Sequence, residues 1–272
     1  MTISGHLLLV GCGKMGGAML RGWLQRGVRP GDVTVVEPNA APVADLAAKS
    51  VRFLDDGAKL PTELKPAVVV VAVKPQMTDG ALPAYRRFVG ANTVFLSIAA
   101  GRTIAYFERR LGAQAAIVRS MPNTPAAVGR GITVACPNRH VAAAQRELCE
   151  QLLAAVGEVA WVQDEGLLDA VTAVSGGGPA YVFLLIECLA EAAVAAGLPA
   201  DLAMRLARVT VSGAGELARL SPEPAAVLRQ NVTSPGGTTL EALKILMAAD
   251  GLQPLMAKAI AAATRRSREL AG

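Results

Sequence analysis

The sequence has few aromatic residues and no apolar run long enough to cross a membrane. Phe, Trp and Tyr make up 4% of the 272 residues, so the apolar share of 52% comes mainly from Ala, Val and Leu. A purely apolar run such as 67–73 is too short for a membrane helix. The chain shows no leader of charged and then apolar residues, because 5–16 already has the pattern of a strand and a turn. We therefore expect a globular protein in the cytoplasm.

Histidine and cysteine are also scarce. With only His6 and His140, a histidine-based triad or metal cluster has too few members, and we interpret both as ordinary surface or turn residues. The cysteines form no Cys-x-x-Cys pair, which disfavours a disulfide framework and a structural zinc site. We predict no metal site and interpret the cysteines as reduced packing residues; they are Cys12, Cys136, Cys149 and Cys188.

The chain carries little excess charge of either sign. The net charge is +5, and its densest part lies at Arg265, Arg266 and Arg268, in a predicted terminal helix without interleaved aromatics. Such a pattern is typical of a solvated helix end. It disfavours nucleic-acid binding.

Short β-branched runs alternate with helical stretches in the first part of the chain, as in an α/β fold with a parallel sheet. We predict strands at 7–10, 33–37, 68–73, 93–97, 116–119, 132–136 and 159–161, with helices such as 16–26 and 104–111 between them. From about residue 167 the strand pattern gives way to long Ala/Leu helical periodicity. We therefore predict an α/β domain over 1–164 and an all-helical domain over 165–272.

The predicted helix over 179–196 is apolar on nearly every face, with only Glu187 and Glu191 charged. A helix that is apolar all round must be buried, and a domain of this size has little interior in which to bury it. We therefore expect a homodimer at least, formed by the helical domains.

A Gly-x-Gly-x-x-Gly motif follows the first predicted strand and opens a helix. In this context Gly11 permits a tight turn, Gly13 lets the backbone approach a pyrophosphate, and Gly16 lets the helix pack closely on the strand. The helix start offers free amides to the anion. The motif predicts a dinucleotide site over Gly11, Cys12, Gly13, Lys14, Met15 and Gly16.

Glu37 ends the second predicted strand, 21 residues after Gly16. An acidic side chain at this point typically accepts hydrogen bonds from the ribose hydroxyls, and its carboxylate would repel a 2′-phosphate. This favours NADH over NADPH. The alternative is a turn at 37–39 whose glutamate faces water.

Each of three further loops either contacts the cofactor or has only a structural role. Lys74, after the third strand, either contacts phosphate or points to solvent. Residues 97–101 either lie against the nicotinamide or only begin a helix. The rigid loop 119–125, with Asn123 at its centre, either walls a nicotinamide pocket or only connects two elements.

The stretch Ser-Pro-Gly-Gly-Thr-Thr at 234–239 predicts an anion site at a helix start. Ser234 is a suitable N-cap, Pro235 suits the first helical position, and two glycines in the first turn leave its amides open to a carboxylate. An ordinary capped helix would not need two glycines, which cost helix stability.

Three glycines at 176–178 open another helix, and either close packing or close approach of a ligand explains them.

Taken together, these motifs resemble pyrroline-5-carboxylate reductase over essentially the whole chain. The motifs Ala-Val-Lys-Pro, Ala-Ala-Gly, Met-Pro-Asn-Thr-Pro and Ser-Gly-Gly-Gly-Pro-Ala-Tyr follow the glycine turn in the family's order, although Gly177 replaces the serine usual there. The stretch at 234–239 is close to diagnostic. The resemblance implies a Rossmann-like domain and a helical dimerisation domain, often within larger rings of dimers.

The resemblance also implies the reduction of 1-pyrroline-5-carboxylate to L-proline with NADPH or NADH. It places the Thr239 hydroxyl on the imine nitrogen and the amides around Gly237, Thr238 and Thr239 on the substrate carboxylate. Glu165 and Asn231 match positions near the bound ligands. The positions that match cofactor contacts are Ala72, Val73, Lys74, Pro75, Ile98, Ala99 and Ala100.

Two rival functions remain. A β-hydroxyacid dehydrogenase has a similar plan with a catalytic lysine early in the helical domain, but no lysine occurs between Lys74 and Lys244. A non-catalytic dinucleotide sensor would retain the glycine turn but would not need the stretch at 234–239.

Overall fold

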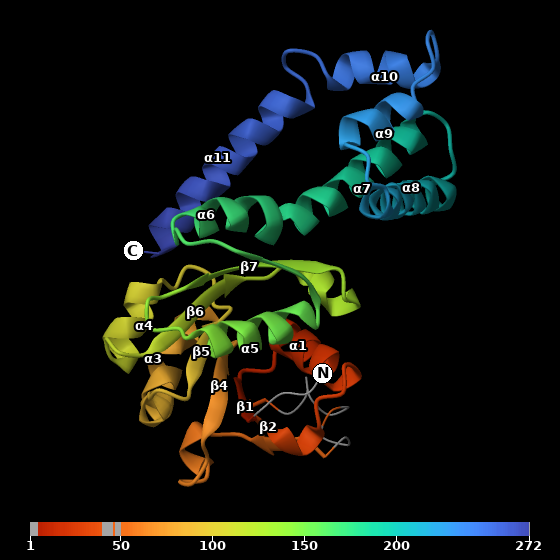
Figure 1. Cartoon of the computed structure of the whole chain (residues 1–272). Helices are drawn as coiled ribbons and strands as arrows, with labels where there is room; N and C mark the ends of the chain where they lie inside the picture. Colours follow the sequence, from red (N-terminus) through yellow and green to blue (C-terminus); the bar gives the residue numbers. More distant parts are fainter. Residues whose placement is uncertain (1–4, 40–45, 47–49, 272) are drawn as a thin grey trace. The chain divides into compact units, whose positions relative to one another are not determined.

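The computed structural model describes residues 5–39, 46 and 50–271, which fall into two compact units (Figure 1). The first unit comprises residues 1–176 and 263–272, and the second comprises residues 177–262. The strands of the first unit are β1 (His6–Val10), β2 (Val33–Val36), β3 (Arg52–Leu54), β4 (Pro66–Val71), β5 (Val94–Ser97), β6 (Ala116–Met121), β7 (Gly131–Pro137) and β8 (Gly157–Trp161).

Helices of both units surround and follow these strands in the chain. In the first unit they are α1 (Lys14–Gln25), α3 (Thr78–Ala81), α4 (Ile104–Leu111), α5 (Ala143–Ala154) and α6 (Leu167–Val171), with the short turns η1 (Pro30–Asp32), η3 (Gly57–Lys59), η4 (Pro75–Met77), η5 (Leu82–Phe88), η6 (Thr124–Val128) and the π-helical η7 (Thr172–Gly176). The second unit contains α7 (Gly178–Ala195), α8 (Ala200–Leu220), α9 (Ala225–Asn231), α10 (Thr238–Leu246) and the first part of α11 (Leu252–Ala271).

The eight strands form one sheet in the order β3-β2-β1-β4-β5-β6-β7-β8. All neighbours pair in parallel except β6 and β7, which are antiparallel. The predicted fold class, a mostly parallel sheet with helices followed by a helical region, is confirmed. The sequence did not predict β3, because three residues at a sheet edge leave too short a pattern.

The central strands are apolar on both faces, as a sheet covered by helices on both sides requires. In β1, Leu7 and Leu9 belong to a core that includes residues of α1 and α5. Leu8 and Val10 point the other way, into a core with residues of η5 and α4. The ends of these parallel strands therefore emerge between two packed layers, which fixes the loops that follow them.

Trp23 joins α1 to α5 inside the first core. Its side chain is fully buried, and its indole Nε1 donates to the carbonyl of Leu152 at 2.9 Å. Leu152 lies in the last turn of α5, where carbonyls have no intrahelical partner. The indole thus satisfies a carbonyl that burial would otherwise leave unpaired.

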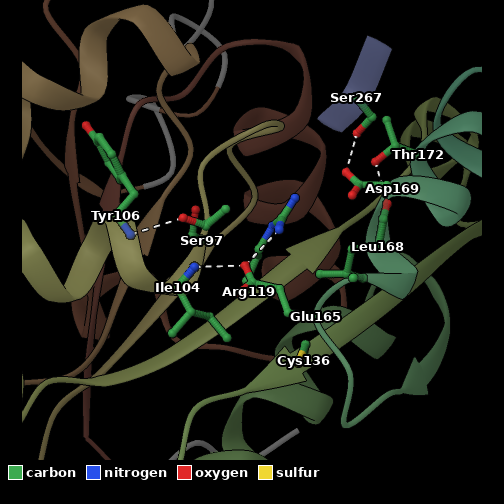
Figure 2. Close-up of polar contacts among 12 residues, drawn as sticks. Ser97, Ile104, Tyr106, Arg119, Cys136, Glu165, Leu168, Asp169, Thr172 and Ser267 are labelled. Atoms are coloured by element: carbon green, nitrogen blue, oxygen red, sulfur yellow. Dashed lines mark hydrogen bonds and ion pairs between the residues drawn. The ribbon is translucent and has the colours of Figure 1, made fainter. Parts of the chain in front are cut away.

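The last residues of α11 pack on the first unit. The Ser267 hydroxyl donates to Asp169 Oδ1 at 2.7 Å (Figure 2). An added Cβ at Gly101 would lie 3.5 Å from Leu270 Cβ. The first unit therefore includes α6, η7 and the end of α11. The functional boundary at residues 164 and 165 stays a prediction.

The second unit buries little of its own apolar surface. Within residues 177–262 the buried side chains are alanines: Ala190 of α7, and Ala203 and Ala207 of α8. Large apolar side chains on α7 are exposed, with Phe183 at 59%. By length and composition alone, the helical run 167–195 is long and apolar enough to span a membrane, and only 6% of that window is buried.

The interpretation of the cysteines and histidines needs two corrections. Cys12, Cys136 and Cys149 are buried, and burial raises the pKa of the Cys136 and Cys149 thiols, which suits packing residues. Cys188 is exposed on α7 and belongs to none of the hydrophobic cores among the described residues. His6 is not a turn residue: it begins β1, is half-buried and hydrogen-bonds Thr34.

We expect Trp23→Phe to lower the free energy of unfolding by roughly 1–3 kcal/mol, because the Leu152 carbonyl loses its donor inside the core. Urea unfolding followed by circular dichroism, at one fixed protein concentration, measures this. Trp161→Phe is the matched control, because Trp161 Nε1 is buried without a hydrogen-bond partner among the described residues. An equal loss in both variants would mean that the indole hydrogen bond is not the cause.

Candidate functional site

The glycine turn after β1 has a backbone that side chains would not permit. Gly11 has φ +89°, and an added Cβ would lie 2.8 Å from the Val73 amide nitrogen. A Cβ at Gly16 would overlap the Gly11 carbonyl, so helix and strand meet here in backbone contact. A Cβ at Gly13 would meet nothing within 4 Å. The turn is closed towards the protein and open at Gly13, which fits the approach of a pyrophosphate.

Helix α1 begins two residues earlier than predicted. Its N-cap is Gly13 and its first residue is Lys14, so Lys14, Met15 and Gly16 form the first turn. The amides of a first helical turn have no intrahelical acceptors and point towards the open side. Lys14 is exposed, Met15 packs against the core, and Cys12 is buried.

Glu37 lies directly beside this turn. Its Oε2 accepts the Cys12 amide at 2.7 Å and its Oε1 accepts the Asn39 amide at 3.0 Å. The side chain is half-buried, one residue beyond the end of β2. The Asn39 contact belongs to the turn at 37–39 of the alternative interpretation, whereas the Cys12 contact holds the carboxylate at the glycine turn; the ribose contact of Glu37 stays a prediction.

The turns after β4 and β5 reach the same edge of the sheet. The Ala72 amide donates to the Val10 carbonyl at 2.7 Å, and the Ile98 amide donates to the Val71 carbonyl at 3.1 Å. Lys74 and Ala100 are exposed, Val73, Pro75 and Ile98 are half-buried, and Ala99 is buried. Residues 97–101 also lead into α4, whose N-cap is Thr103, so both readings of this stretch fit the geometry.

Glu165 is tied to two segments of the first unit (Figure 2). Its Oε1 accepts a hydrogen bond from Arg119 Nη1 at 2.7 Å and one from the Ile104 amide at 2.8 Å. Side-chain exposure is 6% for Arg119 and 28% for Glu165. Because Glu165 binds both the Ile104 amide and Arg119, it holds the start of α4 against β6. Removing one partner of the ion pair would leave the other charge largely buried and unpaired. No local pattern in the sequence predicts this long-range pairing.

Asn123 connects the loop after β6 to η7. Its side-chain amide donates to the Ser175 hydroxyl at 3.2 Å, and its Oδ1 accepts the Ile132 amide at 2.9 Å. A Cβ at Gly176 would overlap the Met121 methyl group. The Met121 side chain thus packs against the backbone at Gly176, and both explanations of the three glycines stay open.

In the second unit, the stretch at 234–239 differs from the prediction. Helix α10 begins at Thr238 with Gly237 as its N-cap, so Ser234 is not the N-cap and Pro235 is not the first helical residue. The physical reason is Gly236, whose φ of +70° interrupts a right-handed helix. The Gly237 amide donates to the Ser234 carbonyl at 3.1 Å, as in a type II turn with Pro and Gly at its centre.

The two features of the predicted anion site, glycines before a helix start and open first-turn amides, are nevertheless present. The glycines precede the first turn of α10, and Thr238 and Thr239 supply its first amides. Asn231 ends α9, where its side-chain amide donates to Glu223 Oε2 at 3.2 Å. This contact of Glu223 was not predicted from the sequence. The one local feature that marks Glu223 is its position between two prolines, eight residues before Asn231.

The structure therefore divides the predicted site residues between the two units. The first unit brings together the glycine turn, Glu37 and the turns after β4, β5 and β6, and it also contains Glu165. The second unit contains Asn231, Gly237, Thr238 and Thr239.

Comparisons with known proteins agree with the motif order. Residues 165–270 match the family described as pyrroline-5-carboxylate reductase dimerisation, and residues 7–101 match NADP oxidoreductase coenzyme F420-dependent. A pyrroline-5-carboxylate reductase of Pseudomonas aeruginosa is 38% identical over 267 residues, which cover 98% of this chain and 97% of the relative.

Solved structures of the same family are similar over nearly the whole chain. The pyrroline-5-carboxylate reductase of Coxiella burnetii has a TM-score of 0.92 at 34% identity, with 99% of this chain and 100% of that chain covered. A Plasmodium falciparum pyrroline carboxylate reductase with NADP bound has a TM-score of 0.83 at 27% identity, with 99% of each chain covered.

These matches support a nicotinamide dinucleotide as the cofactor, and they confirm the resemblance drawn from the motifs. The match extends through both units and includes the glycine turn and the start of α10. With 38% identity over 98% of its length to one such enzyme, the chain belongs to the pyrroline-5-carboxylate reductase family of oxidoreductases.

Proposed function

We propose that this protein reduces 1-pyrroline-5-carboxylate to L-proline with a reduced nicotinamide cofactor, the last step of proline biosynthesis. The observation that carries the proposal is one chain with two anion-accepting helix starts: the glycine turn before α1 and the Pro-Gly-Gly turn before α10. The first suits a pyrophosphate, and the second suits a small carboxylate.

The substrate carboxylate binds at the start of α10. A helix of nine residues offers first-turn amides and the positive end of its dipole. Gly237 has no side chain beside these amides, and Thr238 and Thr239 follow it. We assign the amides of Thr238 and Thr239 to the carboxylate; the third predicted donor, the Gly237 amide, already donates to the Ser234 carbonyl.

The Thr239 hydroxyl hydrogen-bonds the imine nitrogen of the substrate. A protonated cyclic imine is already electrophilic at the carbon of its double bond, so the protein needs to align it and hold its nitrogen rather than supply a strong acid. When hydride reaches that carbon, the nitrogen becomes the secondary amine of proline. Asn231 and Glu165 lie near the ligands in this proposal, with Glu165 Oε1 already engaged by Arg119.

The cofactor binds along the carboxyl edge of the sheet in the first unit, and its reduced nicotinamide supplies the hydride. Gly11 to Gly16 hold the pyrophosphate. The remaining contacts come from Glu37, Ala72, Val73, Lys74, Pro75, Ile98, Ala99, Ala100 and Asn123.

NADH is the preferred cofactor in this proposal. The Glu37 carboxylate accepts the Cys12 amide and is held at the turn, where it suits ribose hydroxyls and repels a 2′-phosphate. In addition, residues 38–48 contain no Arg or Lys that would neutralise such a phosphate.

The protein acts as a homodimer in the cytoplasm, with residues 165–272 as the substrate-binding and dimerisation domain. Support comes from the dimerisation family matched at 165–270 and from the exposed apolar side chains of α7. A second copy would cover these side chains, and Glu187 and Glu191 on the same helix disfavour a lipid environment. Dimers can assemble further into rings.

We expect the purified protein to oxidise NADH or NADPH when given pyrroline-5-carboxylate, and to form reduced cofactor from proline and NAD at high pH. Thr239→Ala should lower kcat about 100-fold, because the hydroxyl oxygen that accepts the N–H of the protonated imine and aligns it is lost. The cofactor Kd should stay within about twofold, because Thr239 lies outside the cofactor contacts.

Thr239→Ser is the matched control for this test, because it retains the hydroxyl and should retain most of the turnover. Full turnover by Thr239→Ala would remove Thr239 from the mechanism. No turnover of wild-type protein in either direction would overturn the proposed function.

We expect Glu37→Ser to raise the ratio of kcat/KM for NADPH to that for NADH by about tenfold, since a repulsive carboxylate is removed from the 2′ position. Steady-state kinetics with both cofactors measure this ratio. Glu63→Ser, which removes an exposed carboxylate of a loop, controls for net charge. A ratio that does not change in Glu37→Ser would show that Glu37 does not meet the ribose.

We expect light scattering at micromolar concentration to give at least twice the mass of one chain. Phe183→Glu should shift the protein towards single chains, because it places a charge on the exposed apolar face of α7. Ala144→Glu, on the exposed surface of α5, should leave the mass unchanged. A wild-type protein that is a single chain in detergent-free buffer would contradict the dimer.

A further inference from the structure

Tyr106 of α4 stands at the centre of a polar cluster in the first unit. Its side chain is 6% exposed, and the guanidinium carbons of Arg102 and Arg110 lie 4.6 and 4.7 Å from its ring centroid. Its hydroxyl donates to Asp79 Oδ1 at 2.8 Å and lies 2.7 Å from the Thr78 hydroxyl. Hydrogen bonds from Tyr106 and Arg110 lower the pKa of Asp79, so the carboxylate stays charged.

Within this cluster Arg102 makes a contact that Arg110 lacks. Both Nε and Nη2 of Arg102 donate to the Pro75 carbonyl, at 3.0 and 2.8 Å. The same carbonyl accepts the Thr78 hydroxyl at 2.7 Å. Arg102 and Pro75 are 27 residues apart, so these bonds join the loop before α4 to the turn after β4.

The carbonyl that Arg102 holds belongs to the turn that carries Lys74. On one side this turn rests on the glycine turn, since a Cβ at Gly11 would lie 2.8 Å from the Val73 amide. On the other side, Arg102 fixes the carbonyl of the residue that follows Lys74. The Lys74 side chain itself is exposed. The backbone from which Lys74 projects is thus held from two directions, while its ammonium group is left to a ligand.

We propose that Arg102 is a positioning residue for the cofactor. It does not touch the cofactor; it sets the orientation of the turn at Lys74 and Pro75, and thereby the direction in which Lys74 meets the cofactor phosphates or ribose. This rests on the proposed function, in which the cofactor lies along this edge of the sheet. Charge-assisted hydrogen bonds to one half-buried carbonyl suit the role, because they are directional and strong.

Arg110 provides a matched control. It stacks on the same ring and pairs with the same carboxylate, at 2.7 Å from Asp79 Oδ1, whereas Arg102 lies 3.9 Å from Asp79 Oδ2. Arg110→Leu therefore removes a ring contact and an ion pair. Arg102→Leu removes a ring contact, a longer ion pair with the same carboxylate, and both bonds to the Pro75 carbonyl, so the Pro75 bonds are what the two variants do not share.

The test measures NADH and NADPH Kd by fluorescence titration, together with thermal stability, for wild type, Arg102→Leu, Arg102→Lys and Arg110→Leu. We expect Arg102→Leu to weaken cofactor binding about tenfold, Arg102→Lys to recover part of the loss, and Arg110→Leu to stay within about twofold of wild type. An unchanged Kd in Arg102→Leu, or equal losses in both leucine variants, overturns the proposal.

A double-mutant cycle shows whether Arg102 acts through the turn. Lys74→Ala and Lys74→Ala with Arg102→Leu complete the cycle, and the loss caused by Arg102→Leu should shrink to about twofold once Lys74 is absent. Strictly additive losses overturn the proposal. Wild-type protein that binds neither cofactor would overturn the proposed function itself, whereas wild-type binding with no effect of Arg102→Leu overturns only the role of Arg102.

Discussion

The backbone contact between the glycine turn and the turn after β4 is the constraint on which the rest of the first unit depends. A Cβ added at Gly11 would lie too close to the Val73 amide, and a Cβ added at Gly16 would overlap the Gly11 carbonyl. Because β1, α1 and the turn after β4 converge there, their positions cannot vary independently. The open side at Gly13 and the carboxylate of Glu37 follow from this convergence, since Glu37 is held by the Cys12 amide of the same turn.

A second layer of polar contacts extends this rigidity along the sheet edge. The start of α4 is joined to β6 through Glu165 and Arg119, and the loop before it is joined to the turn after β4 through Arg102 and Pro75. The turn after β4, the loop after β5 and strand β6 are therefore joined around the start of one helix, α4. A cofactor that lies across these loops meets a surface that is arranged before it binds, which lowers the cost of ordering on binding.

The sequence predicted the parts of the fold that local patterns encode. Apolar runs located the central strands, and the glycine motif located the turn before α1 because its three glycines each answer a local backbone requirement. It failed at β3, where three residues form an edge strand. It also misplaced the start of α10, because the same Ser-Pro-Gly-Gly letters suit a capped helix and a type II turn, and only the φ of Gly236 decides between them.

Among the site contacts, those between distant residues could not be predicted from one sequence. Arg119 and Glu165 are 46 residues apart, and Arg102 and Pro75 are 27 residues apart, with no periodicity that links either pair. Arginines in such a chain are equally suited to a solvated surface. Only the packing of α4 against the sheet brings these groups within hydrogen-bond distance, so the positioning of the cofactor loops is a tertiary property.

The second unit depends on a different constraint. Its buried side chains within 177–262 are three alanines, each of which contributes little apolar area, while Phe183, Leu184 and their neighbours on α7 stay exposed. Helices with so little internal burial gain most of their tertiary stability from the surface that covers them. If a second copy supplies that cover, folding of the helical unit and association of the chains are one equilibrium. A ligand that binds only the folded helical unit would then favour association as well, so ligand binding and subunit association would be thermodynamically linked.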